Sequence, residues 1–599
     1  MSQGLISIQN WSDSRQIMKL EVSGQNGHLS FFSRLQHKLE GFWYRSQIGH
    51  RSEYSVERLL SLRDYCLRTS VARVVVICFL APVPALLTAL AIDCIPLKPP
   101  SEGWKTNYTL WIRLFLAMLI EAMGVLFQVR AVINPGTISS SGGVKIAITT
   151  AGLSVLTMVI FAVLWEFPTP FGYVLVIGPY VLYFSISTVL VVGRQTLIQS
   201  PTLRQQFKSQ FIIVASQGLV GMCYPAFSAV FNRLSGTQQT LLIFVMPMIK
   251  FFTKQNIANA AKSYHEYVGP VVVFSVDLFN VFYVAICMQA SKSAMTTLVI
   301  MISDTFHVIL ALRDMFPRKT SRVIPNRQIE TQLTHYLEDL PKLLEQKFHD
   351  GRSLDRIRVF APFPLPLSNS SRKCMSEMTA TRRLTQGEIT RCSKESTKQT
   401  SGPSLKDFPM PTLPEAKQNQ IVPAIVVETK ISSSDNLDKD SRNITKFVVH
   451  DGLQILFHSE YILLAEYIEF MVPMLYALYL SVLYHLPVAA FYPHSASMTS
   501  QKLRSTVTNV LVYGMIEFAA FGVLLVLLKR KLGFLPLYQL AFVLETQAPA
   551  LQGHLFVWTI TILHLTLNRS SFGVWYPIAF FLDGRWKGSS KYARGSGVR

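Results

Sequence analysis

The sequence predicts an all-α membrane protein, a polytopic bundle of about 12 transmembrane helices. Half of the residues are hydrophobic and only 16% are charged, whereas about a quarter of the residues of a soluble protein are charged. The apolar residues gather in charge-poor runs of about 20 residues, the length that a helix needs to cross a hydrocarbon core about 30 Å thick. Such runs are too long for barrel strands, and irregular backbone is too costly in lipid. Helices are therefore expected throughout.

The net charge agrees with a membrane location. The chain has 57 Lys and Arg residues against 36 Asp and Glu residues, a formal charge of +21. These basic residues flank the apolar runs, which is typical of cytoplasmic anchoring charges. We therefore expect the lipid bilayer, and not a nucleic acid, to be the partner of the basic residues.

Residues 1–73 precede the first apolar run and are expected in the cytosol. Aromatic and leucine residues alternate there with basic ones, a pattern of an interfacial helix that lies on an anionic inner leaflet. A helix packed beneath the bundle explains the pattern equally well. The apolar members are Phe31, Phe32, Leu35, Leu39, Phe42 and Trp43, and the basic ones are Arg34, His37, Lys38 and Arg45.

Residues 74–312 contain eight predicted spans: 74–92, 109–129, 146–165, 171–192, 211–231, 241–252, 268–288 and 294–312. Residues 461–567 contain four more: 461–484, 506–528, 532–544 and 551–567. The segments 241–252 and 532–544 are short for a bilayer, and each contains a proline, Pro247 or Pro536. Either segment could be re-entrant.

Basic loop residues give an orientation. With the N-terminus inside, most of them fall on the inner side, as the positive-inside rule requires, and removal of either short span would break this pattern. We therefore predict twelve spans with both termini in the cytosol, in the plasma membrane or an endomembrane. The inner basic residues are Arg130, Lys145, Arg194, Arg204, Lys208, Lys250, Lys254, Lys262, Lys529, Arg530 and Lys531.

Residues 313–460 form a long polar insert that the same orientation places in the cytosol, together with the basic tail 568–599. Its first part has a helical period, after which the composition predicts a largely disordered segment that could engage cytosolic proteins. The periodic residues are Ile329, Leu333, Leu337, Leu340, Leu344 and Phe348.

Five acidic residues lie near the midpoints of different predicted spans: Glu121, Asp277, Asp304, Glu469 and Glu517. A charge costs roughly 2.5 to 3.5 kcal/mol at that depth, so some of these groups must be protonated, paired or hydrated. Few basic partners are expected near them, which favours protons or metal cations over anions. Asn280 follows Asp277 by three residues, and His307 follows Asp304 by three, so each pair shares a helix face. Alternatively, these side chains only fix helix packing through hydrogen bonds.

Glycine and proline residues predict breaks in two spans. Gly178 and Pro179 lie in the middle of one span, and Gly221 and Pro225 interrupt another. Transport proteins often unwind helices at mid-membrane to present backbone groups.

Enzyme signatures are not present: the sequence has no HExxH, Walker loop, GxSxG or kinase motif. Seven cysteines, none in a CxxC pair, indicate neither a disulfide framework nor a zinc site. We therefore expect no enzymatic activity, no cofactor and no resident metal.

Several stretches resemble a large family of multi-pass membrane proteins of oomycetes that has no assigned activity. They are residues 55–66 (SVERLLSLRDYC), the IPL sequence at 95–97 with EGW at 102–104, CMQ at 287–289, YHLP at 484–487, RKLGF at 530–534 and LAFVLE at 540–545. The resemblance implies a eukaryotic polytopic membrane protein and transfers no catalytic or binding residue.

These observations predict transmembrane transport of a cation or of a proton-coupled solute, with the midplane carboxylates as the pathway. The alternative is a membrane-anchored signalling or scaffolding protein that acts through its cytosolic insert. Convergence of the carboxylates on one site would favour transport.

Overall fold

The computed structural model describes residues 41, 46–133, 136–165, 167–169, 172–231, 245–290, 309, 334–349, 357–363, 365–380, 433–492 and 498–565. All regular secondary structure in these residues is helical, and no strand occurs among them. The predicted interfacial helix, the span 294–312 and the tail 568–599 lie outside these residues, apart from Gly41 and Ile309. The all-α prediction is confirmed for the part that is described.

Six helical segments are long and apolar enough to cross a membrane. The first is Val71–Asp93, which consists of α4 (Val71–Leu80) and α5 (Val83–Asp93). The other five are α7 (Tyr108–Arg130), α8 (Ser140–Leu164), α9 (Gly172–Val192), the part Val448–Leu483 of α20, and α22 (Ser500–Leu532). Large apolar side chains such as Leu190 and Val523 point outward, with 75% and 61% of their surface exposed. These helices indicate a membrane protein, because water would not tolerate such a surface.

The predicted count of twelve spans is not reached among the described residues. Three more helices correspond to predicted spans: α11 (Pro201–Phe231), a composite helix of α14 (Val268–Val272), η4 (Val273–Asp277) and α15 (Leu278–Ala290), and α24 (Ala548–Leu565). The composite helix is buried almost throughout from Val268 to Phe282, so it lies in the centre of the bundle.

The two short predicted spans have different outcomes. Residues 245–252 belong to α13 (Val245–Ala260), which extends eight residues further than expected, while residues 241–244 lie outside the described part of the chain. The segment 532–544 is wrong as a separate span. Gly533 ends α22 in a left-handed conformation, and α23 (Leu537–Thr546) has ten residues, a length of about 15 Å or half the hydrocarbon core. From Gln539 to Leu544, α23 is buried between other helices.

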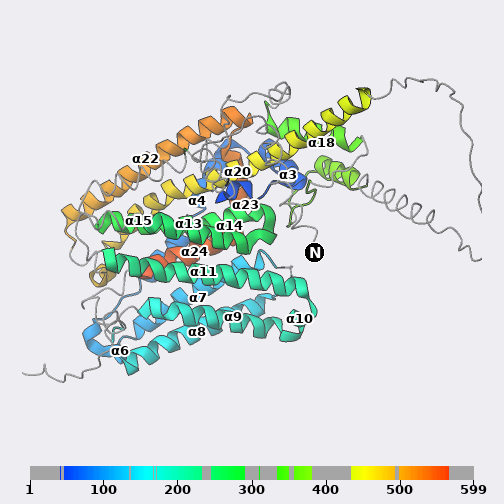
Figure 1. Ribbon diagram of the computed structural model, residues 1–599. Coiled ribbons are helices and arrows are strands. Elements are labelled where there is room, and N and C mark those ends of the chain that lie inside the picture. Colours follow the sequence, from blue (N-terminus) through cyan, green and yellow to red (C-terminus); the bar gives the residue numbers. More distant parts are fainter. Residues whose placement is uncertain are drawn as a thin grey trace, which may run out of the picture.

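Helix α20 (Ser433–Leu483) is 51 residues long, about 75 Å at 1.5 Å per residue, so it extends far beyond one bilayer. Figure 1 shows it passing along the bundle and projecting past one end. Near that end, α18 (Tyr336–His349) from the insert packs against α20 and against α3 (Val56–Arg68). Part of the insert therefore belongs to the folded core.

Two acidic residues of α3 hold a part of the insert in place. We call this part, residues 357–363 and 365–380, the docked segment. Glu57 accepts hydrogen bonds from the amides of Ala361 and Leu365 at 2.8 and 3.3 Å. Asp64 accepts from the Ser368 amide and the Ser371 hydroxyl at 2.7 and 3.0 Å. The amides that an irregular segment would leave unpaired are thereby satisfied.

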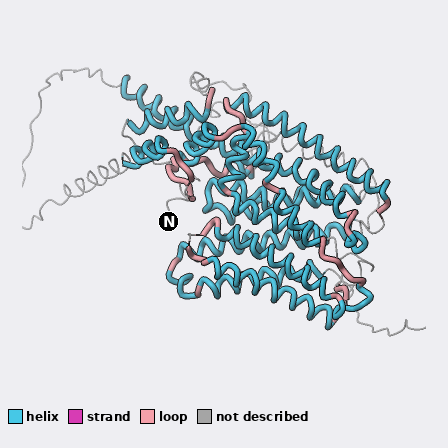
Figure 2. The backbone as a smooth tube through the Cα atoms, turned by 180° about the vertical axis from the view of Figure 1, so that it is seen from behind, coloured by secondary structure: helices cyan, strands magenta, loops and turns pink. Residues whose placement is uncertain are grey.

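The transmembrane helices run side by side, with α8 and α9 at one edge of the bundle and α22 at the other, as both views show (Figures 1 and 2). Helices α7 and α24 meet most closely at two glycines. A Cβ atom on Gly553 would lie 2.4 Å from the carbonyl oxygen of Gly124. Small residues at such crossings let membrane helices approach closely.

The helix breaks predicted from glycine and proline are wrong. Helix α9 continues through Gly178 and Pro179, and α11 continues through Gly221 and Pro225 to Phe231. A proline removes one backbone hydrogen bond, and a membrane helix tolerates this without unwinding. The irregular backbone is found instead at η3 (Ala261–Tyr267), where His265 has a φ of 52°, and at the π-helical turn η4.

Candidate functional site

A group of ionisable side chains lies where α13, η4, α20 and α22 meet, and we call it the charged cluster. Helix α13 contributes Lys250 and Lys254, and the end of η4 contributes Asp277. The Asp277 carboxylate lies 3.3 Å from Lys250 Nζ and 2.8 Å from Lys254 Nζ. Lys254 also donates to the Tyr461 hydroxyl at 3.0 Å. Asp277 is fully buried, and both lysines are largely buried.

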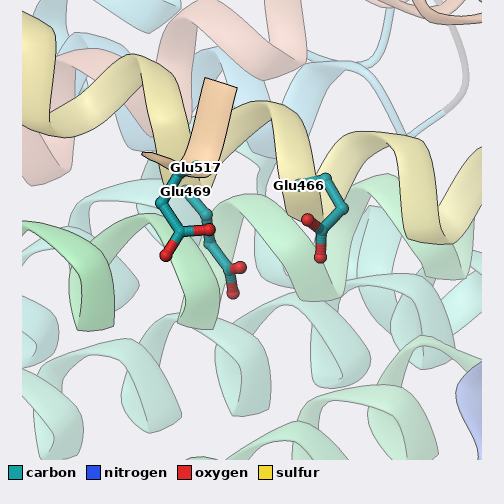
Figure 3. Close-up of side chains that lie close together, drawn as sticks. All are labelled: Glu466, Glu469 and Glu517. Carbon is teal, nitrogen blue, oxygen red and sulfur yellow. The ribbon is translucent and has the colours of Figure 1, made fainter. Parts of the chain in front are cut away.

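Three glutamates extend the cluster across α20 and α22. Figure 3 shows Glu469 beside Glu517, with Glu466 one turn along α20. One carboxylate oxygen from each lies within 4.8 Å of the others, and all three side chains are buried. Lys250 links the two halves, because its Nζ is also 3.7 Å from Glu469.

The cluster adjoins an irregular turn in the central helix. Residues Val273–Asp277 form a π-helical turn, so the extra residue in this turn places Asp277 at its end. Single π turns inside α-helices occur frequently at functional sites. This local backbone is what sets the carboxylate opposite the two lysines of α13.

Carboxylates outnumber lysines among the described residues of the cluster. Four carboxylates, Asp277 and the three glutamates, face two lysines. Two carboxylates 4.8 Å apart repel each other by about 3.5 kcal/mol at an effective dielectric constant of 20. If all were ionised, these six groups would by themselves sum to two negative charges. Bound protons or a bound cation would lower the repulsion among the carboxylates.

The two lysines overturn one sequence-based expectation. We expected few basic partners near the carboxylates and counted Lys250 and Lys254 as loop charges in the topology. Both lie inside α13 and pair with Asp277. The predicted span ended near Lys250, because the apolar run ends there. Hydropathy alone does not show that the helix continues beyond that run, or that its lysines point into the protein.

The predicted acidic layer divides in the structure. Asp277, Glu469 and Glu517 converge on the charged cluster, which Glu466 joins. Glu121 is separate: it accepts a hydrogen bond from Tyr173 and another from Thr561 Oγ1 at 3.0 Å. Asn280 is buried on α15, while Asp304 and His307 lie outside the described residues.

Two further buried ion pairs were missed by the sequence reasoning. Arg58 Nη2 donates to both oxygens of Glu460 at 2.9 and 2.8 Å, and Tyr54 donates to the same carboxylate. Burial lowers the pKa of Arg58, but Glu460 together with Tyr54, Glu266 and Tyr267 outweighs it and holds that pKa well above its ordinary value. The position of Arg58 three residues after the cap Ser55 hinted at an ordered helix, although nothing in the sequence indicated its partner.

The second missed pair lies at the other end of the bundle. Arg113 pairs with Asp93, and Tyr479 and Tyr492 each donate to that carboxylate at 2.7 Å. Here the charges balance and the hydroxyls satisfy both carboxylate oxygens. Such a network fixes helix packing, although Arg113 Nε and Nη1 have no hydrogen-bond partner among the described residues.

The fold and the cluster together define a helical membrane protein with a buried, carboxylate-rich polar site. Comparisons with protein-family models, with curated proteins and with solved structures find no match. The resemblance to the oomycete membrane proteins therefore stays a prediction.

Proposed function

We propose that this protein transports a cation, or a solute together with protons, and that the charged cluster binds the transported positive charge. The observation that carries the proposal is the convergence of four buried carboxylates on two lysines from four helical elements. Packing alone does not call for four carboxylates in one place, because bringing them together costs free energy in a low-dielectric interior.

The position of the cluster supports a pathway. Glu469 and Glu517 lie near the middle of helices long enough to cross a membrane, and Asp277 lies on the central helix of the bundle. Ionisable residues inside membrane segments typically line ion paths or proton relays. The lysines can act as internal counter-charges that hold Asp277 until a cation or proton replaces them.

The experiment uses the full chain in vesicles with an internal pH-sensitive dye. An imposed membrane potential should drive proton entry, and parallel assays should test Na⁺ and K⁺. Glu469→Gln and Glu517→Gln should abolish the flux, because they remove carboxylates of the cluster and keep the side-chain shape. Glu102→Gln is the matched control, since Glu102 is exposed and lies outside the cluster.

Folding of each variant is checked by its melting temperature in detergent. Well-folded cluster variants that keep the wild-type flux would overturn the proposal. A wild-type protein that passes none of the three cations faster than empty vesicles would overturn transport of these cations by themselves.

The scaffolding alternative keeps a separate test, which the structure refines. Residues up to Ala380 belong to the docked segment, and α20 begins at Ser433. A Gly/Ser replacement should therefore be confined to residues 381–432. Loss of a cytosolic binding partner with unchanged cation flux would assign a binding role to that stretch.

A further inference from the structure

A cavity lies away from the charged cluster, among α7, α9, α11 and α24. Its volume is about 50 Å³, enough for about three water molecules when each needs roughly 10 to 15 Å³. Its wall is mostly apolar but carries polar groups, which belong to Glu121, Tyr173, Tyr180, Gln217, Trp558 and Thr561. Apolar cavities of this size stay dry, whereas polar ones hold water.

Polar groups around this cavity have incomplete hydrogen bonding among the described residues. Tyr180 and Trp558 are at least nine-tenths buried, yet the Tyr180 hydroxyl and Trp558 Nε1 have no hydrogen-bond partner there. Glu121 uses one oxygen, Oε1, for both of its protein donors, Tyr173 and Thr561. A buried donor without a partner costs about 1 to 3 kcal/mol, so water at this site is favourable.

Gln217 connects the cavity to the π-helical turn η4. The Gln217 amide Nε2 lies 2.9 Å from Ser275 Oγ and 3.3 Å from His554 Nδ1, and all three side chains are buried. Ser275 belongs to η4, the same π-helical turn that ends at Asp277. A polar path of neighbouring groups therefore runs from Glu121 through the cavity to the turn that bears the charged cluster.

We propose that the cavity holds water and that this water, with Gln217 and Ser275, makes Glu121 a second proton-binding site linked to the charged cluster. The hydration stands on the cavity alone, while the link rests on the proposed transport function. A proton taken up by Glu121 forms an O–H bond to the carboxylate. It leaves when that bond breaks and a cavity water accepts it, and Gln217 orients that water, so no other reactant is needed.

Hydration is tested by brief X-ray radiolysis of the full chain in detergent, because hydroxyl radicals formed from internal water oxidise nearby buried side chains. Met118 lines the cavity and is 1% exposed, whereas Met158 is 7% exposed and does not line it. Met118, Tyr180 and Trp558 should be oxidised faster than Met158. A cavity without water would leave Met118 as protected as Met158 and would overturn the proposal.

A substitution gives an independent test of whether the cavity holds water, because the melting temperature should change differently in the two cases. In a hydrated cavity Tyr180→Phe removes a hydrogen bond and lowers the melting temperature; in a dry cavity it removes an unpaired hydroxyl and leaves that temperature unchanged or higher. Gly221→Ala should slow the oxidation of Met118, since the added methyl narrows the cavity, and its nearest contact is the flexible end of Ile177 at 3.3 Å. Gly522→Ala, with open space around it, is the matched control.

The link is tested by proton flux in vesicles. Gln217→Leu and Glu121→Gln should each reduce the flux about tenfold, the factor that corresponds to one hydrogen bond with a charged partner. Wild-type flux in both variants would overturn the link and leave the proposed function intact. A wild-type protein without proton flux would overturn the proposed proton pathway and the link together, while the radiolysis result would still decide the hydration.

Discussion

The crossing of α7 and α24 gives the sharpest prediction for a single methyl group. In Gly553→Ala the new Cβ would start 2.4 Å from the Gly124 carbonyl oxygen, about 1 Å closer than an ordinary contact. The neighbouring atom is backbone, so the helices must separate. Overpacking of this kind costs about 1 to 3 kcal/mol, and a gap of up to 1 Å loses a quarter to a half of the dispersion energy of the contacts that it opens.

The separation should also reach the cavity. Glu121 lies one turn before Gly124 on α7, and its hydrogen bond from Thr561 of α24 is 3.0 Å long. A shift of about 1 Å would break that bond. We therefore expect a lower melting temperature in detergent and faster backbone hydrogen exchange in both helices.

Two matched controls separate this effect from the general effect of alanine. Gly152 and Gly522 lie in α8 and α22, and a Cβ atom at either would meet nothing within 4 Å. Alanine there should stabilise the helix by about 0.5 to 1 kcal/mol. If Gly553→Ala matches Gly152→Ala and Gly522→Ala in melting temperature, the close crossing of α7 and α24 is refuted.

Two further predictions concern the docked segment. Asp64→Asn should weaken the attachment of Ser368 and Ser371 by about 1.5 to 3 kcal/mol, because hydrogen bonds to a charged acceptor are lost. Limited trypsin digestion should then cut faster after Arg372 and Lys373. The control Glu338→Gln, at an exposed residue of α18, should leave the rate unchanged, and equal rates in both variants would contradict the role of Asp64. Burial raises the pKa of the Cys374 thiol to about 11, and the neighbouring Glu345 carboxylate is the next cause. The thiolate fraction of Cys374 should therefore rise about tenfold per pH unit between pH 7 and 10, and its rate of labelling by maleimide should rise with it. A labelling rate that levels off near pH 9 would show that the thiol is not held as described.

The sequence predicted the helical class because segregation of apolar residues depends only on local composition. The runs at 109–129, 146–165 and 171–192 correspond to α7, α8 and α9 within a few residues. The same reasoning failed for 532–544, since a short apolar run looks the same whether it crosses a bilayer or is buried between other helices. Only the contacts of α23 with its neighbours distinguish the two.

The acidic residues show the same limit at the level of the site. Their depth in the spans predicted that Asp277, Glu469 and Glu517 matter, because a charge in lipid is costly wherever it lies. Their partners could not be read from the sequence: Lys250 and Lys254 precede Asp277 by more than 20 residues, and Glu469 is almost 200 residues beyond it.

The sequence by itself thus determined that the chain is a helical membrane protein with carboxylates at mid-span, since hydropathy and helical rise act along the chain. The tertiary structure alone decided which carboxylates meet, because that depends on helix packing, on the π-helical turn before Leu278 and on the glycine contact of α7 with α24. It gathered three of the predicted acids with Glu466 and two lysines, and it placed Glu121 at a cavity of its own. Pairwise contacts between distant segments carry no periodic signal, so no local pattern could have revealed them.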